Sequence, residues 1–119
     1  MKPIDFIYKV MSTEFKDADG GHMSKPVVSS KLALIARKKQ TIAGFMLYEI
    51  SGAELFVHAI WVNKKLRRIG LARRMIRRFL QKYDKQTIWA YANPQGQALA
   101  KSCGFAVGTT EYREIILRS

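Results

Sequence analysis

Residues 63–79, NKKLRRIGLARRMIRRF, decide the fold of this chain. The stretch follows an apolar run with strand character, turns at Gly70 after several basic residues, and continues with the periodicity of an amphipathic helix. The first N–H groups of a helix have no partner within the helix, and the helix dipole places positive charge there. A glycine at the turn leaves room for an anion to approach these groups. The stretch therefore predicts a site for a phosphate-bearing ligand at the start of a helix.

The chain is strongly basic, and most of its excess charge lies in and beside this stretch. Its 119 residues include 21 lysines and arginines against 9 acidic residues, a net charge of +12. Ten of the basic residues lie between positions 63 and 86, where Asp84 is the one acidic residue. Such a patch attracts a phosphorylated cofactor, an acidic protein or a nucleic acid. A solvated helix face that serves solubility would show the same pattern.

Length and composition favour a single intracellular domain over residues 1–119. A hydrophobic fraction of 48% supports a core, and the lone Cys103 excludes a disulfide framework. No Cys/His cluster has the spacing of zinc ligands, and neither a run of 18 apolar residues nor a signal-peptide core occurs. We therefore expect a cytoplasmic protein with no metal site and no association with a membrane.

The hydrophobic periodicity along the chain predicts a mixed sheet with helices. The predicted elements are a helix over 4–15, a long loop over 16–31, strands over 32–37, 41–50 and 54–62, a helix after Gly70, a strand over 87–92, a weaker helix over 94–102, and one bent strand or two strands over 105–118. The first three strands form an antiparallel meander. The crossover helix makes strand 87–92 parallel to strand 54–62.

Two details of the meander bear on the site. Alternation along strand 54–62 predicts one face with Leu55, Val57, Ala59 and Trp61, and another with Glu54, Phe56, His58 and Ile60. Glu54 and His58 should therefore project on the same side. Gly44, inside strand 41–50, indicates a bulge or a close backbone contact.

Arg67-x-x-Gly70-x-Ala72, between a strand and a helix, resembles the R/Q-x-x-G-x-G/A signature of the GNAT superfamily of N-acetyltransferases. The segment from Asn93 to the pair Gly104-Phe105 is similar to the N-x(10)-G-F helix of the same family, and the likeness extends from about residue 31 to the C-terminus. It implies a GNAT-like mixed α/β sheet, in which an antiparallel meander precedes a βαβ unit and the central strands splay. Residues 31–119 would form the core, after a variable helix and loop over 1–30.

The resemblance also implies that acetyl-CoA is the cosubstrate. Strand residues 60–62 would pair with the pantetheine arm as an added strand does, and the backbone of residues 67–72 would hold the pyrophosphate. An N–H near Trp61 or Val62 would stabilise the oxyanion. The cofactor-binding residues so assigned are Ile60, Trp61, Val62, Arg67, Arg68, Ile69, Gly70, Leu71, Ala72 and Asn93.

Direct acetyl transfer needs a proton acceptor for the amine. Glu54 is the first candidate, because AELFVHAI over 53–60 resembles the histone-type members, in which a glutamate works through water. His58 is the second candidate, since imidazole titrates in the useful range. Many members carry a tyrosine as general acid where this chain has Ala100, and Tyr91 and Tyr112 are candidate substitutes. Structural alternatives are an exposed residue at a strand start for Glu54 and a packed core histidine for His58.

These residues predict an acetyl-CoA-dependent N-acetyltransferase acting on a primary amine in a ternary complex. Only about thirty residues precede the meander, where the family usually has a strand and two helices, so we expect an open acceptor site and an exposed sheet edge. An open site favours a protein or peptide acceptor, and an exposed edge favours a homodimer. Two other classes stay open: a catalytically silent acyl-CoA-binding module, and a module that binds nucleic acid or tRNA through the basic helix.

Overall fold

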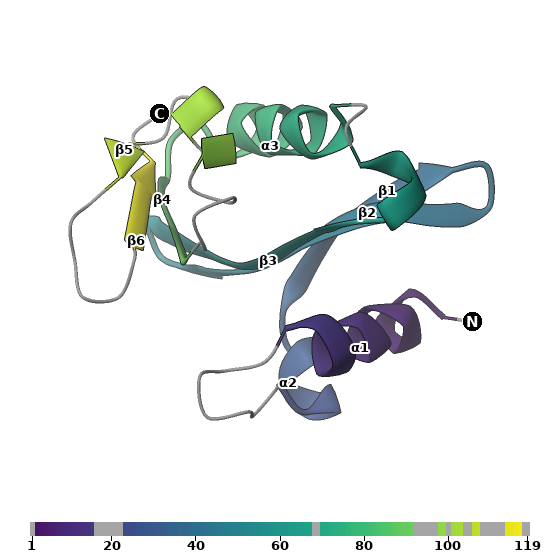
Figure 1. Cartoon of the computed structure of the whole chain (residues 1–119). Helices are drawn as coiled ribbons and strands as arrows, with labels where there is room; N and C mark the ends of the chain where they lie inside the picture. The colour runs from purple at the N-terminus through teal and green to yellow at the C-terminus, as the bar shows by residue number, and fades with distance from the viewer. Residues whose placement is uncertain are drawn as a thin grey trace.

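The described residues form a six-stranded mixed sheet in the order β1-β2-β3-β4-β6-β5, with helices on both of its faces (Figure 1). The computed structural model describes residues 2–15, 23–67, 70–91, 98–99, 101–103, 106–107 and 114–117, with the backbone alone at 91, 106–107 and 114–117. In chain order the elements are α1 (Pro3–Glu14), α2 (Lys25–Ser29), β1 (Leu32–Lys38), β2 (Thr41–Ser51), β3 (Glu54–Val62), the 3-10 helix η1 (Lys64–Leu66), α3 (Leu71–Lys82), β4 (Thr87–Tyr91), β5 (Ala106–Val107) and β6 (Glu114–Leu117).

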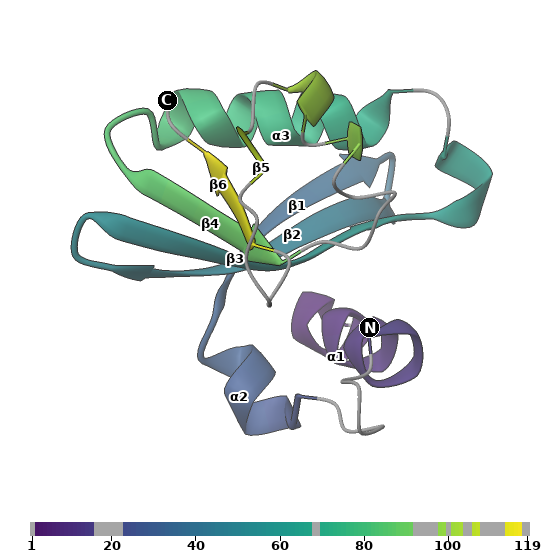
Figure 2. The ribbon, with the colours of Figure 1, turned by 60° about the vertical axis from the view of Figure 1, so that its left-hand side comes forward.

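Two hydrophobic clusters hold the helices against opposite faces of the sheet. Helix α3 covers one face, and α1 lies with α2 on the other (Figure 2). Under α3, the buried Met75, Ile76 and Phe79 pack against residues of β2, β3 and β4. Under α1, Ile7 and Met11 pack against other side chains of β2 and β3. Strands β2 and β3 therefore contribute to both clusters.

Helix α3 forms because its sequence separates apolar and charged residues at helical spacing. Gly70 precedes it in a left-handed conformation, with φ 78° and ψ 14°. At the other end, the hydroxyl groups of Tyr48 on β2 and Tyr83 lie 2.7 Å apart and share a hydrogen bond. Burial and this hydrogen bond raise the pKa of Tyr48. The buried face of α3 thus packs the helix against the sheet, and the hydrogen bond between Tyr83 and Tyr48 holds its C-terminal end.

Gly44 on β2 makes the close backbone contact that its position in the strand predicted. A Cβ at Gly44 would lie 2.7 Å from the carbonyl oxygen of Trp61 and 3.1 Å from the sulfur of Met75. Glycine therefore lets β3 and α3 approach β2 at the end of the sheet where α3 begins.

The predicted alternation of β3 is wrong beyond His58, because the strand carries a β-bulge there. β2 and β3 pair regularly as far as Tyr48↔Val57 and resume at Leu47↔Ala59, so His58 is an extra residue without a partner on β2. A bulge places two successive side chains on the same side of the sheet. Leu55, Val57 and Ile60 consequently belong to the cluster under α3, whereas Ala59 and Trp61 belong to the cluster under α1.

Strands β3 and β4 are parallel, as predicted, and are paired over only part of their length. Their register runs from Glu54↔Thr87 to Val57↔Ala90. Beyond this point, residues 58–62 of β3 have no partner among the described residues of β4. The two central strands therefore separate from His58 onward, which agrees with the predicted splay.

The N-terminal region differs from the prediction in one element. The helix over 4–15 is confirmed as α1, but the predicted loop over 16–31 contains the helix α2. Ser24 starts α2 by accepting a hydrogen bond from the N–H of Val27 at 3.4 Å, and Pro26 lies in the first turn. Among residues 2–15 and 23–31 no strand occurs, and β1 is an edge of the sheet.

The C-terminal predictions are confirmed in part. Of the two alternatives for the tail, two strands, β5 and β6, are present. Residues 98–99 and 101–102 are helical, and the rest of the predicted helix over 94–102 lies outside the described residues. No described helix is both long and apolar enough to cross a membrane.

Candidate active site

A cavity of about 360 Å³ lies where β3 ends and α3 begins. Its walls come from the end of β3, from η1 and the turn after it, from the first residues of α3, and from the second helical segment: Val62, Leu66, Arg67, Gly70, Leu71, Ala72, Arg73 and Leu99. Five of the predicted cofactor residues are thus brought together around one cavity. Of the others, Arg68, Ile69 and Asn93 lie outside the described residues.

The start of α3 is free to hold an anion at this cavity. No side chain caps the helix, because its N-cap is Gly70, and the first turn contains no acidic residue. The side of Gly70 where a Cβ would lie is open space to beyond 4 Å. Backbone N–H groups of the first turn are therefore without a side-chain partner beside a cavity with basic walls, which is the environment that stabilises phosphate.

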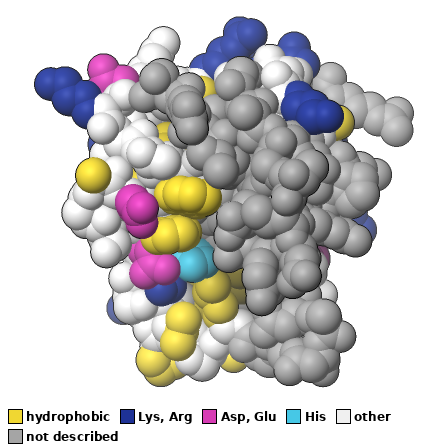
Figure 3. Space-filling model, turned by 90° about the vertical axis from the view of Figure 1, so that its left-hand side faces the viewer, with side chains coloured by type: hydrophobic (Ala, Val, Ile, Leu, Met, Phe, Trp, Pro, Cys, Tyr) yellow, Lys and Arg dark blue, Asp and Glu magenta, His cyan; other side chains and the backbone are white. Residues whose placement is uncertain are grey.

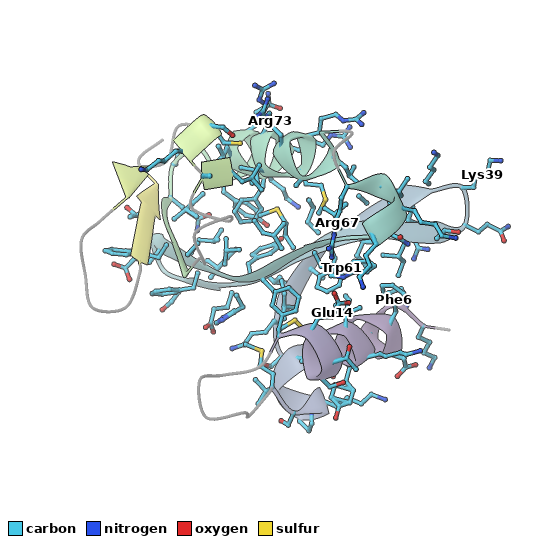
Figure 4. The ribbon with its side chains drawn as sticks, viewed as in Figure 1. Phe6, Glu14, Lys39, Trp61, Arg67 and Arg73 are labelled. Atoms are coloured by element: carbon cyan, nitrogen blue, oxygen red, sulfur yellow. The ribbon has the colours of Figure 1, made fainter. Side chains whose placement is uncertain are left out.

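Arg67 fixes the turn to the sheet and to α1 by its side chain. Its Nε donates a hydrogen bond of 3.0 Å to the carbonyl oxygen of Val62, and its guanidinium lies 3.7 Å from a carboxylate oxygen of Glu14. The other oxygen of Glu14 accepts a hydrogen bond of 3.0 Å from the indole N–H of Trp61. Figure 4 shows these three side chains grouped between α1 and the end of β3. The side chain of Arg67 thus positions the turn, and Arg67 is also one of the residues that line the cavity.

The backbone of β3 presents hydrogen-bonding groups to the gap left by β4. The N–H of Asn63 donates to the carbonyl oxygen of Ala43 on β2 at 2.8 Å. Because backbone groups alternate along a strand, the N–H of Trp61 also points to β2, whereas those of Ile60 and Val62 point to the gap. Of the two predicted oxyanion donors, strand geometry therefore favours Val62. Trp61 itself is buried under α1, against Phe6 and Phe45.

His58 lies at the point where β3 and β4 separate, on the face of the sheet that also carries α1. Its Nε2 is 2.8 Å from one carboxylate oxygen of Glu49, and Nζ of Lys31 donates a hydrogen bond of 3.0 Å to the other. In Figure 3 a histidine lies beside acidic and hydrophobic side chains. The side chain of His58 is 22% exposed, so it is neither free in solvent nor sealed in the core.

The carboxylate of Glu49 contacts both of the other side chains, Lys31 and His58. Hydrogen bonds from Lys31 first, and from His58 second, lower the pKa of Glu49. An ionised carboxylate only accepts hydrogen bonds, so the proton between the two groups belongs to Nε2 of His58. Nδ1 is the other ring nitrogen, and in an imidazole that is protonated at Nε2 alone it carries the lone pair. Nothing in the local sequence pointed to Glu49 or Lys31, because strand pairing alone brings them to His58.

Glu54 is exposed at the start of β3, in the paired part of the sheet, opposite Ser51 on one side and Thr87 on the other. It shares a face with His58, as predicted, but lies four residues away along the strand. Tyr112, the predicted substitute for the general acid, lies outside the described residues. Ala100, the position where many family members have a tyrosine, also lies outside them.

The profile of the Acetyltransferase (GNAT) family matches residues 7–105 of this sequence, which is most of the chain. The chain belongs to this family. It is therefore a GNAT N-acetyltransferase, and the family uses acyl-CoA as the donor of the acyl group. No curated protein sequence matches this acetyltransferase significantly.

Several solved structures share the fold of this acetyltransferase at low sequence identity. The ribosomal-protein-S18-alanine N-acetyltransferase from Escherichia coli is 19% identical with a TM-score of 0.72, over 98% of this chain and 86% of that one. Ard1 from Thermoplasma volcanium is 13% identical with a TM-score of 0.70, over 95% and 86%. The PaiA N-acetyltransferase from Thermoplasma acidophilum, solved in complex with coenzyme A, is 17% identical with a TM-score of 0.61, over 72% and 58%.

Proposed function

We propose that this acetyltransferase takes acetyl-CoA in the cavity at the start of α3 and transfers its acetyl group to a primary amine of a protein. The observation that carries the proposal is the alignment of three features along β3. The cavity at the start of α3 lies at its end, the N–H groups of Ile60 and Val62 follow without a partner on β4, and a candidate base, His58, lies where β3 and β4 part. Acetyl-CoA has the same order of parts: pyrophosphate, an amide-bearing arm and a thioester.

The residues at each position fit one part of this substrate. N–H groups of the first turn of α3 hold the pyrophosphate, with Gly70 leaving their approach open. The open edge of β3 offers strand-like hydrogen bonds to the arm. A cavity of about 360 Å³ accommodates only part of so long a ligand, which agrees with a site that continues along the gap between the strands.

In the reaction, the amine nitrogen forms a bond to the carbonyl carbon while the carbon–sulfur bond breaks and the thiolate leaves. Nδ1 of His58 takes the proton that the amine loses, and Glu49 stabilises the imidazolium by its negative charge. The N–H of Val62 donates to the carbonyl oxygen as that oxygen gains charge. No residue of the chain becomes acylated.

We assign the base to His58 rather than to Glu54. His58 lies at the separation of the strands and has a partner that orients its ring, whereas Glu54 is exposed between two paired neighbours. The acceptor then reaches His58 from the face that carries α1, opposite α3. One protein of the same fold is named as an N-acetyltransferase of a ribosomal protein, which supports a protein amine as the acceptor.

Calorimetric titration with acetyl-CoA tests the binding part of the proposal. The wild type should bind, and Gly70→Glu should abolish binding, because the carboxylate would occupy the anion site with charge of the wrong sign. Binding that Gly70→Glu leaves unchanged would show that the ligand lies elsewhere.

Release of free thiol in the presence of peptides tests the chemical part. A peptide with a free α-amine, its N-terminally blocked form with one lysine, and a polyamine distinguish the acceptor. His58→Ala should lower kcat/KM by a factor of about 10²–10⁴, and Glu54→Gln should have little effect. The reverse result would assign the base to Glu54.

A further inference from the structure

Glu14 is an acidic residue in an unfavourable place for its own helix. It is the last residue of α1, and the last turn of this helix contains no basic residue. A carboxylate there is repelled by the negative end of the helix dipole. The side chain of Glu14 instead contacts Trp61 on β3 and Arg67 in the turn before α3 (Figure 4). Glu14 therefore weakens α1 locally, and its favourable interactions are those with other elements.

One carboxylate oxygen of Glu14 is the hydrogen-bond acceptor for a buried indole. Trp61 is 8% exposed and packs against the rings of Phe6 and Phe45. A buried indole N–H needs a partner within the protein, and Nε1 of Trp61 donates to Oε2 of Glu14 at 3.0 Å. The indole N–H of Trp89, also buried, has no such partner among the described residues. Glu14 thus fixes the ring of the residue that precedes Val62.

The other carboxylate oxygen of Glu14 lies near the side chain that holds the peptide unit after Val62. This oxygen is 3.7 Å from the guanidinium of Arg67, whose Nε donates a hydrogen bond of 3.0 Å to the carbonyl oxygen of Val62. In the same peptide unit, the N–H of Asn63 donates to the carbonyl oxygen of Ala43 at 2.8 Å. Both polar groups of this peptide are therefore held, and Arg67 holds one of them.

We propose that Glu14 is a positioning residue for acetyl transfer, which holds the N–H of Val62 in place through Trp61 and Arg67. The inference rests on the proposed function, in which this N–H donates to the carbonyl oxygen of the thioester. An oxyanion donor is effective when its position is fixed before the charge develops. Strand β4 does not supply this restraint, because residues 58–62 have no partner among its described residues. Glu14 supplies it from the α1 side, through contacts before and after Val62.

Steady-state kinetics of Glu14→Ala tests this inference. Removal of an oxyanion donor costs about 10²–10³ in kcat, so displacement of the donor should cost less, about tenfold. The Kd of acetyl-CoA, measured by calorimetry, should change less than kcat, because N–H groups at the start of α3 hold the pyrophosphate. Glu14→Gln keeps an acceptor for the indole N–H and loses the charge beside Arg67. Its kcat should lie between those of Glu14→Ala and the wild type.

The matched control is Asp5→Ala. Asp5 is the other acidic residue of α1, it pairs with Lys25 at 2.7 Å, and its side chain is 38% exposed, as is that of Glu14. Because Asp5 lies in the first turn, where the helix dipole favours a carboxylate, Asp5→Ala should lower the free energy of unfolding and leave kcat unchanged. A wild-type kcat in Glu14→Ala, or an equal fall of kcat in Asp5→Ala, would overturn the inference.

A double-mutant cycle with Arg67→Ala measures whether Glu14 and Arg67 act together. The loss of kcat in the double variant should be smaller than the product of the two single losses, because both side chains act on Val62. A loss equal to that product would overturn the shared action.

Amide hydrogen exchange at Asn63 is a readout that does not depend on turnover. Exchange should be several-fold faster in Glu14→Ala than in Asp5→Ala or the wild type, because the peptide unit after Val62 is held less firmly. A wild type that releases no thiol would contradict the proposed function. Unchanged exchange at Asn63 in Glu14→Ala would contradict the role of Glu14 alone.

Discussion

Gly70 has two properties that favour glycine over every other residue type at this position. Its φ of 78° lies in the left-handed region, and no atom lies within 4 Å of the position that a Cβ would take. Gly52, in the turn between β2 and β3, shares both properties, with φ 60° and no atom within 4 Å of a Cβ position. Gly52 lies at the opposite end of β3 from the cavity, so a substitution at Gly52 is the control for the same substitution at Gly70.

Gly70→Ala and Gly52→Ala should each destabilise the fold by about 1–2 kcal/mol, because alanine is strained in the left-handed region. Only Gly70→Ala should also weaken the binding of acetyl-CoA, since of the two glycines only Gly70 lines the cavity. Denaturant unfolding and calorimetry measure the two effects. Equal acetyl-CoA affinity in both variants would leave Gly70 with a purely conformational role.

Glu49 offers a way to distinguish positioning of His58 from simple packing. Its carboxylate contacts the ring of the proposed base and orients it. In Glu49→Gln this contact is weakened, so kcat should fall while the KM for acetyl-CoA stays near the wild-type value. Lys31→Gln keeps the contact between Glu49 and His58 and should lower kcat less. Steady-state kinetics of both variants measures this, and a loss of stability with unchanged kcat in Glu49→Gln would contradict a positioning role.

The same carboxylate makes a predictable contribution to acid stability. The pKa of Glu49 is lowered in the folded state, mainly by Lys31 and next by His58. Its contribution is therefore complete above the ordinary pKa of a glutamate and is lost as the pH falls through the lowered value. The difference in free energy of unfolding between wild type and Glu49→Gln should shrink over this acidic range, which denaturant titrations at a series of pH values measure. A difference that is constant with pH would exclude the ion pair as its source.

At the scale of elements, α3 carries like charges at helical spacing. Arg77→Gln/Arg78→Gln removes like-charge pairs such as Arg73–Arg77 and Arg78–Lys82, each worth about 0.2–0.5 kcal/mol of repulsion at low salt. The variant should thus be more stable than the wild type at low salt, and the gain should vanish at high salt. Thermal unfolding at two salt concentrations measures this. A less stable variant would mean that contacts of these arginines outweigh the repulsion.

The elements that could be predicted are those with a continuous hydrophobic period. α1, α3 and the strands of the meander were predictable within one or two residues, as was the parallel β4, because the pattern of each is unbroken. Helix α2 was missed because a helix of five residues is too short for a period; its signals were Ser24 as N-cap and Pro26 in the first turn. Serine and proline are also common in turns and loops, so composition alone did not distinguish this helix from a loop.

The site was predictable where it depends on the local chain and not where it depends on pairing. The motif from Arg67 to Ala72 identified the turn and the start of α3, whose lining residues surround the cavity. The bulge at His58 was invisible, because alternation assumes regular pairing and the extra residue is defined only against β2. The contacts of His58 with Glu49 and of Arg67 with Glu14 could not be predicted either, because each of them joins residues from different elements.

At the scale of the whole molecule, the sheet ends on one side in β1, and no described strand lies beyond it. Leu32, at the start of β1, is 46% exposed, and Arg37 and Lys38 lie at its other end. Two antiparallel β1 strands centred on Ile35 would place Lys38 opposite Leu32 and Arg37 opposite Ala33. Within the strand, over residues 32–38, such a pairing buries apolar surface and opposes no two cations. The net charge of +12 nevertheless repels a second copy.

We therefore predict a homodimer through β1 whose fraction rises with salt, because salt screens the repulsion between two strongly basic chains. Leu32→Lys should abolish it, since the new lysine would lie opposite Lys38 of the other copy on an edge that already lacks a strand partner. Val27→Lys is the matched control, because Val27 is 42% exposed on α2 and outside the edge. Light scattering after size-exclusion chromatography measures the mass at each salt concentration. A monomer at every salt concentration, or a dimer that Val27→Lys disrupts and Leu32→Lys does not, would contradict pairing through β1.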